Sequence, residues 1–373
     1  MRHASCFMNS RGSTVAWVSL GSLALLGGVL AAQAPQSSDS GEPTFRAGTT
    51  LVEVSAIVTR GGQPVSDLRQ DDVRVLDNGV EQPLVAFEYV ELTTVEGPAQ
   101  RRDFVLVVDD WHISPQLTPQ TQQVAEAFLQ ALGPHDRLAL VTTGPHQITV
   151  DLTTDRAAVG EAIARLRGQQ PSGPPAPFEL ELRARGAFDV IRSVATSMEG
   201  DAAERRTVVL VSEGHQLLSD GPGRLNDDPA VLAMYMDVVR SAAIANVAIY
   251  AIDPRGLMAP VPGIGTGGPG IAASIGPGMS GGSGSSMAGR RFGSLGTIAM
   301  HTGGSLTVDT NDLAADIPGI VRDSRQYYRL AYVQPEPAKG KAQPRTRRIE
   351  VKVDRRGVEV RARQQYVPGR VDG

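Results

Sequence analysis

This 373-residue sequence has one cysteine, a small net charge and no second long apolar run. The formal net charge of −4 favours neither nucleic acid nor an anionic membrane surface as a partner. The single cysteine, Cys6, precedes the long apolar run from Val15 to Leu30. A lipoprotein cysteine would instead stand at the end of that run. Beyond that run no segment is a candidate for crossing a membrane, and no internal repeat is found.

The first 34 residues have the pattern of a secretory signal peptide. Arg2 and Arg11 lie in a polar start, the apolar run follows, and Ala32-Gln33-Ala34 provides a small-x-small exit. We expect cleavage after Ala34, so that the chain is exported, to the periplasm or outside the cell, without a thiol, disulfide or cysteine metal site. The alternative is a retained anchor, which would be the chain's sole contact with a membrane, although glycines and serines dilute this run and it is slightly short for a span.

Sequence motifs for phosphate binding and serine hydrolysis are missing too. Gly263 to Gly268 is rich in glycine, but no Gly-Lys-Ser/Thr follows and no strand leads into it. Ser212-Glu213-Gly214-His215 brings a hydroxyl, a carboxylate and an imidazole together without the Gly-x-Ser-x-Gly frame of a nucleophile elbow. We therefore expect no enzyme. The alternative is a hydrolase that combines Ser114 or Ser212, His112 or His215, and Asp109 or Asp110.

Patterns of buried strands and amphipathic helices alternate over residues 102–326. Phe104 to Val108 is a short apolar run bounded by charge, typical of a strand buried on both faces of a parallel sheet. Further strands are expected at 137–143, 148–152, 207–211, 247–252 and 305–308, the second of these antiparallel at the sheet edge. Helices are expected at 119–132, 155–167, 178–198, 229–246, 292–302 and 312–325, with threonine caps at Thr118 and Thr154 and a kink at Pro318. The predicted fold class is α/β, a doubly wound, mostly parallel six-stranded sheet of Rossmann-like type with one antiparallel edge strand.

On both sides of this α/β segment, apolar and polar residues alternate with period two. Thr50 to Thr59 reads as a half-buried strand, and Asp77-Asn78-Gly79 predicts a hairpin between Val73–Leu76 and Leu84–Val90. Strands are also expected at 327–333, 348–353 and 358–362, the last two joined by a turn at 354–357. Each set has too few strands to bury a face, so we expect 49–95 and 327–366 to pair into one small β-sandwich-like module, with two separate modules as the alternative. Residues 35–48 are interpreted as a flexible leader and 254–290 as a mobile, glycine-rich insertion.

This order of elements resembles a von Willebrand factor type A (vWA) domain over 102–326, and more closely the exported bacterial vWA-related proteins. The resemblance is carried by Phe104 to Asp109, by Val208 to Gly214 and by Thr302-Gly303-Gly304 before the last strand. In the flanks it is carried by Asp71 to Val75 with Asn78-Gly79, and by Tyr327 to Tyr332. The resemblance implies a non-catalytic domain that binds another protein or an extracellular macromolecule.

Adhesive vWA domains carry a metal-ion-dependent adhesion site (MIDAS), with Asp-x-Ser-x-Ser after the first strand, a later threonine and an aspartate after the fourth strand. Such oxygen ligands suit Mg²⁺ or Mn²⁺. Asp109 matches the first acid, but Trp111 and Ile113 occupy the serine positions. Starting instead at Asp110 places His112 and Ser114 there, Glu213 stands for the later aspartate, and no threonine between 169 and 186 fits the pattern.

We therefore predict a degenerate MIDAS and no resident cofactor. If the altered site binds an ion at all, the resemblance implies Mg²⁺, Mn²⁺ or Ca²⁺, and an acidic group of the partner would complete it. The candidate metal ligands are Asp109, Asp110, Ser114 and Glu213, and the candidate ligand-facing residues are Trp111, His112 and His215. In the alternative, purely structural reading, Asp109 caps a turn, Trp111 packs under the sheet edge and Glu213 binds backbone amides at a helix start.

Overall fold

Runs of valine, leucine and isoleucine form the centre of a six-stranded sheet. The computed structural model describes residues 50–92, 102–173, 176–198, 205–214, 229–257, 293–308, 310–337 and 346–368, all within a unit that spans 47–373. The predicted signal peptide, the leader and residues 258–290 of the predicted insertion lie outside the described residues. Among the described helices, none has the length and apolar composition needed to cross a membrane.

The strand order of this sheet is β11-β10-β9-β6-β7-β8. Its strands are β6 (Asp103–Val108), β7 (Arg137–Thr142), β8 (Thr149–Thr153), β9 (Arg206–Val211), β10 (Val247–Ile252) and β11 (Leu306–Thr307). All neighbours pair in parallel except β7 and β8, which pair antiparallel. The predicted six-stranded, mostly parallel sheet with an antiparallel edge strand is therefore confirmed.

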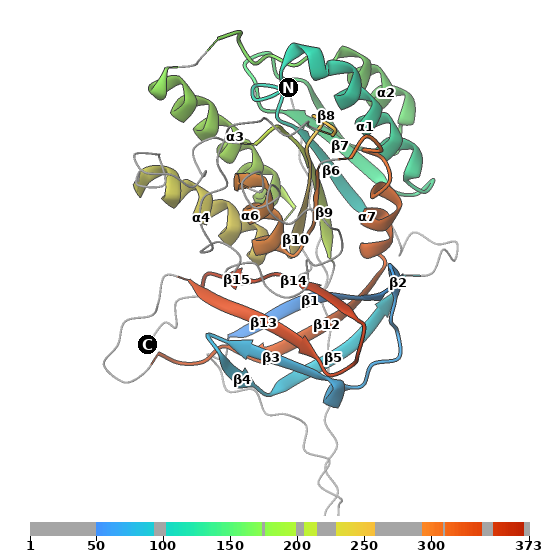
Figure 1. Ribbon diagram of the computed structural model, residues 1–373, viewed down its shortest axis with the longest axis vertical. Coiled ribbons are helices and arrows are strands. Elements are labelled where there is room, and N and C mark those ends of the chain that lie inside the picture. Colours follow the sequence, from blue (N-terminus) through green and yellow to red (C-terminus); the bar gives the residue numbers. More distant parts are fainter. Residues whose placement is uncertain are drawn as a thin grey trace, which may run out of the picture. The chain divides into compact units, whose positions relative to one another are not determined.

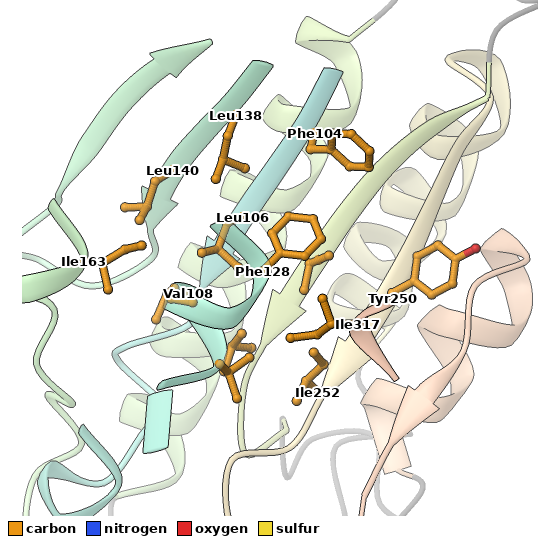
Figure 2. Close-up of a cluster of buried hydrophobic side chains, with 14 of the residues drawn as sticks. Phe104, Leu106, Val108, Phe128, Leu138, Leu140, Ile163, Tyr250, Ile252 and Ile317 are labelled. Carbon is orange, nitrogen blue, oxygen red and sulfur yellow. The ribbon is translucent and has the colours of Figure 1, made fainter. Parts of the chain in front are cut away.

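Helices cover both faces of this sheet (Figure 1). On one face lie α1 (Thr118–Ala131), α2 (Arg156–Arg165) and α7 (Ile317–Asp323), and on the other α3 (Pro177–Ser197), α4 (Pro229–Ile244) and α6 (Gly293–Thr302). Figure 2 shows the core of the first face, where Phe128 of α1 and Ile163 of α2 point toward side chains of the sheet strands. Burying both faces explains why the central strands are continuous apolar runs.

Three predicted helix boundaries were wrong. Thr118 does not cap α1: it is the first helical residue, and its hydroxyl accepts a hydrogen bond from the amide of Gly168 at 3.0 Å. Asp155, not Thr154, caps α2, because its carboxylate accepts from two backbone amides of the first turn. Pro318 lies in the first turn of α7, where a proline needs no amide hydrogen bond, so it starts a short helix and does not kink a long one.

Two antiparallel sheets make up the β module. The first has the order β14-β1-β12-β5, with β2 also paired to β1, and the second has the order β15-β13-β3-β4. Their strands are β1 (Leu51–Arg60), β2 (Gln63–Pro64), β3 (Val73–Asp77), β4 (Val80–Gln82), β5 (Leu84–Glu91), β12 (Gln326–Val333), β13 (Arg347–Val353), β14 (Glu359–Ala362) and β15 (Gln365–Tyr366). Since β1 pairs with β12 and β3 pairs with β13, both sheets combine strands from the two flanks of the α/β segment.

Two predicted hairpins are built differently in this module. The turn at Asn78-Gly79, with φ of 49° and 81°, joins β3 to the short β4, while β5 crosses to the other sheet and pairs with β12. Likewise β13 and β14 are successive in the chain but lie in different sheets. The reason is that side chains of both sheets share one apolar core, which includes Val54, Val75, Leu330 and Ile349.

Candidate functional site

The candidate site lies where β6, β7 and β9 end. Asp109, Thr143 and Ser212 follow these three neighbouring strands, and parallel neighbours present their carboxyl ends at one edge. Backbone hydrogen bonds extend the ladder past the strands, from Asp109 N to Val211 O at 2.9 Å and from Thr143 N to Val108 O at 3.2 Å. The three side chains are therefore held at fixed positions on the sheet edge.

Asp109 is fully buried and is the centre of a hydrogen-bond network. Its Oδ1 accepts from the hydroxyl of Thr143 and lies 2.9 Å from Nδ1 of His112, and its Oδ2 accepts from the hydroxyl of Ser212 at 2.7 Å. An ionised carboxylate only accepts, so the hydrogen of the His112 contact lies on Nδ1. Both oxygens of Asp109 are thus bonded to donors of the protein itself.

Asp110 points to a different set of partners. Its Oδ1 accepts from the amide of Gly144 at 2.7 Å, its Oδ2 accepts from the side-chain amide of Gln169, and its carbonyl accepts from the Gln169 amide at 2.6 Å. Burial, and to a smaller extent the charge of Asp109, raises the pKa of the Asp110 carboxyl above its ordinary value. Asp110 therefore links the loops that contain Gly144 and Gln169, and its hydrogen-bond donors differ from those of Asp109.

Ser114 and Glu213 form a third, separate contact. Oε1 of Glu213 accepts from both the amide and the hydroxyl of Ser114, each at 2.6 Å. Ser114 precedes the 3₁₀ turn η3 (Pro115–Leu117), so the carboxylate lies at the start of a helical turn. Gly168 packs so close to this loop that a Cβ there would lie 2.4 Å from the Ser114 carbonyl oxygen.

Trp111 is half-buried beside α3, where Gly186 leaves room for its ring: a Cβ on Gly186 would lie 3.2 Å from the indole. Phe178 and Leu182 occupy the positions eight and four residues before Gly186, on the same face of α3. They are 71% and 53% exposed. His112, by contrast, is buried against Asp109, and His215 lies outside the described residues.

The candidate metal ligands belong to three separate hydrogen-bond groups in this arrangement. Asp109, Asp110 and Glu213 each bond to a different group of partners, and Trp111 and Ile113 supply no ligand atom where the MIDAS has serines. Within the described parts of the chain, no group of three or more His, Cys, Asp or Glu side chains is placed to hold a metal ion. In this arrangement each of the three carboxylates is bonded to donors of the protein.

Thr143 is the site residue that the sequence analysis missed. The search for a threonine followed the family spacing and covered 169–186, whereas Thr143 stands directly after β7. The parallel pairing of β6 with β7 could have indicated Thr143, because it places the residue after β7 beside Asp109, the residue after β6.

The hydrogen-bond order also differs from that of a serine hydrolase. In such an enzyme the serine bonds to a histidine and the histidine to the acid. Here the hydroxyl of Ser212 donates to Asp109, and Asp109 lies between Ser212 and His112. Ser114 donates to Glu213. In the described contacts, neither hydroxyl is directed to an imidazole base.

By its strand order, its antiparallel edge and its two helical layers, the α/β segment is a vWA-like domain, as its sequence predicts. No family model matches the chain, and no curated protein matches it. An aerotolerance-related membrane protein from Bacteroides fragilis is a structural neighbour with 10% identity and a TM-score of 0.36, over 60% of this chain and 98% of that chain.

Two further neighbours carry the vWA name in their own descriptions. A von Willebrand factor type A structure from Catenulispora acidiphila has 13% identity and a TM-score of 0.33, over 87% of this chain and 75% of that chain. The SpRpn10 VWA domain has 13% identity and a TM-score of 0.31, over 58% of this chain and 93% of that chain. At these identities the likeness concerns the fold alone.

Proposed function

We propose that this chain is an exported, non-catalytic binding protein whose vWA-like domain contacts a protein or another extracellular macromolecule without a divalent cation. The contact is made at the sheet edge that carries the 109–114 loop. The absence of a cation from this proposal is supported by Asp109, because both of its carboxylate oxygens are bonded to protein groups: Thr143, His112 and Ser212.

Energetics favour the protein donors over a cation at this position. A hydrogen bond to a charged group contributes about 1.5 to 3 kcal/mol, and a buried group that loses its partner costs a comparable amount. A cation at Asp109 would have to displace donors from a fully buried carboxylate and leave their hydrogens unpaired. Among the described residues, the nearby carboxylates Asp110 and Glu213 are themselves bonded to other protein donors.

The surface next to this network suits a macromolecular partner. Trp111 lies half-buried on α3, and the exposed Phe178 and Leu182 continue the apolar face of the helix. Large aromatic and aliphatic side chains that rest on a rigid support supply much of the energy in protein interfaces. Trp111 belongs to the hydrogen-bonded 109–114 loop, which provides such a support.

Site-specific photo-cross-linking in the native host tests this proposal. A benzophenone amino acid at Leu182 reports on the proposed surface, and one at Val85 of β5, 46% exposed, is the matched control on the β module. We expect one partner species to be captured from position 182 and not from position 85. Excess unlabelled chain should compete with this capture, and EDTA should not reduce it.

Two outcomes contradict the proposal in different ways. Capture at position 85 alone would place the interface on the β module. Capture at position 182 that EDTA abolishes, together with micromolar Mg²⁺ or Mn²⁺ binding in calorimetry that an Asp109→Ala, Glu213→Ala double variant lacks, would establish the metal-dependent alternative.

A further inference from the structure

A small, partly open cavity lies where the β module meets the α/β domain, away from the candidate site. Its volume is about 10 Å³, and its polar lining comes from β1, from α6 and from the residues just before β9, just before β10 and just after β14: Ser55, Arg205, Asn246, His301, Thr302 and Arg363. A space of this size holds one water molecule or one small ion. Its lining decides which of the two fits.

Arg205 is 8% exposed and reaches the cavity from the segment before β9. Its Nη2 donates to the carbonyl of Gly303 at 2.8 Å and to the hydroxyl of Tyr250 at 3.2 Å. Its Nε is buried and has no hydrogen-bond partner within the described residues. Figure 2 shows the Tyr250 hydroxyl at the outer end of the ring, turned away from the apolar cluster.

Arg363 reaches the same cavity from the other side, after β14. Its Nη1 donates to the carbonyl of Ala243 at 3.0 Å and its Nη2 donates to the carbonyl of Glu53. Its Nε is also buried and unpartnered in the described part of the chain. Burial lowers the pKa of Arg363 to about 10; the charge of Glu53 opposes this shift, and the charge of Arg205 adds to it to a smaller extent. Two like charges thus share one small space.

The carboxylates near this cavity, Asp323 and Glu53, do not line it. Asp323 accepts from Arg361 at 2.5 Å and from the hydroxyl of Tyr250 at 3.0 Å. The charge of Glu53 acts on Arg363, and Oε2 of Glu53 is buried without a hydrogen-bond partner within the described residues, but Glu53 lines a larger neighbouring cavity and not this one. No carboxylate among the described residues forms an ion pair with Arg205 or Arg363.

The remaining lining does not supply negative charge either. Burial lowers the pKa of His301 to about 4, so its imidazole is neutral at pH 7, and its Nδ1 contacts the hydroxyl of Tyr235 at 2.5 Å. The hydroxyl of Thr302 donates to the carbonyl of Ile298 at 2.9 Å. Unpaired buried donors point to an unseen acceptor, and two positive charges favour an anion over water.

We propose that this cavity binds a single monatomic anion, chloride under ordinary conditions, held between the Nε–H groups of Arg205 and Arg363. Because the first residue belongs to the α/β domain and the second to the β module, the anion joins the two parts of the chain. It acts as a structural ligand and takes no part in partner binding.

Bromide provides a direct test because it replaces chloride and scatters anomalously. Crystals of the chain grown without halide and soaked in sodium bromide should give an anomalous peak in the cavity, within hydrogen-bond reach of both Nε atoms. A cavity that contains only water, or nothing, under these conditions overturns the proposal.

Thermal unfolding supplies a measurement in solution. At constant ionic strength, replacing sodium gluconate by sodium chloride should raise the unfolding midpoint, and the rise should depend on chloride concentration as mass action requires. Arg363→Met should lose this rise, and Glu53→Gln, which removes a nearby negative charge but leaves the cavity lining intact, should shift it to lower chloride concentrations. If Arg363→Met does not fold, Glu53→Gln alone decides. A wild-type midpoint that is the same in both salts, or an unchanged response in either folded variant, contradicts the proposal.

Discussion

The hydroxyl of Ser212 donates a hydrogen bond of 2.7 Å to Oδ2 of Asp109, across the junction of β9 and β6. This contact places a protein hydroxyl on an oxygen of the carboxylate that matches the first acid of the MIDAS pattern. The Asp109 carboxylate is therefore an internal structural group, and its removal should affect folding before it affects any ligand.

Asp109→Asn should destabilise the chain. The amide keeps the shape of the side chain but loses the charge and turns one acceptor into a donor, which faces the donors of Ser212, Thr143 or His112. We expect the free energy of unfolding to fall by about 2 to 4 kcal/mol, measured by urea denaturation with and without Mg²⁺. A loss that appears only when Mg²⁺ is present would show that a cation, not the protein donors, satisfies this carboxylate.

Gly168→Ala should separate the two loops of the candidate site. The added Cβ would lie 2.4 Å from the Ser114 carbonyl oxygen and 2.6 Å from that of Ile113, so the backbone must move. We expect a loss of about 1 to 3 kcal/mol in unfolding free energy. Gly160→Ala is the control: nothing lies within 4 Å of its Cβ, it is inside α2, and it should gain up to about 1 kcal/mol. Equal effects of the two variants would argue against a close approach at Gly168.

Asp77 should be the most sensitive carboxylate of the β module. It is fully buried and accepts from the hydroxyls of Tyr332 at 3.0 Å and Tyr366 at 2.7 Å and from Nε of Arg347 at 2.5 Å. Asp77→Asn leaves the Arg347 charge buried without its partner, so we expect a loss of about 3 to 5 kcal/mol in chemical denaturation.

The exposed ion pair between Asp67 and Arg355 is the natural comparison for Asp77. Asp67 is 76% exposed, and solvent screens such a pair. Asp67→Asn should therefore cost less than about 1 kcal/mol. Similar losses in the two variants would mean that Asp77 is not the structural centre of the module.

His301 should make the chain sensitive to mild acid. Its pKa in the folded chain is lowered to about 4 by burial, so between that value and the ordinary pKa of about 6.5 the unfolded chain binds more protons. Stability from this residue is complete above pH 6.5 and is lost as the pH falls through that window.

A His301→Gln variant isolates this effect from the titration of the carboxylates. Between pH 7 and pH 5 the wild type should lose about 1 to 2 kcal/mol more unfolding free energy than the variant. The measurement is denaturant unfolding at both pH values for both proteins. Parallel losses in the two proteins would place the acid sensitivity in other groups.

The central sheet was predictable because its signals are local. Each buried strand is a continuous apolar run, and the alternation of strands with helical patterns permits few topologies. Hairpin partners were not predictable in the same way. The turn at Asn78-Gly79 is in place, but tertiary packing decides that β5 leaves the hairpin for the other sheet.

The candidate site was predictable only in part. Sequence position locates Asp109, Asp110 and Glu213 at strand ends, yet it does not tell which donors will bond to their oxygens. Thr143 shows the reason: it is 34 residues from Asp109, and only the pairing of β6 with β7 brings the two together. Side-chain rotamers decide whether these three carboxylates can bind the same group, and the sequence pattern does not specify rotamers.

The pairing of β1 with β12 has a consequence for how the chain is made. Synthesis begins at the N-terminus, so β1 is produced long before β12 and β14, with which it pairs. The vWA-like domain between them has all its strands earlier. We therefore expect the β module to close after the strands of the vWA-like domain are complete, and a chain cut short after α7 would leave β1 paired with β2 alone.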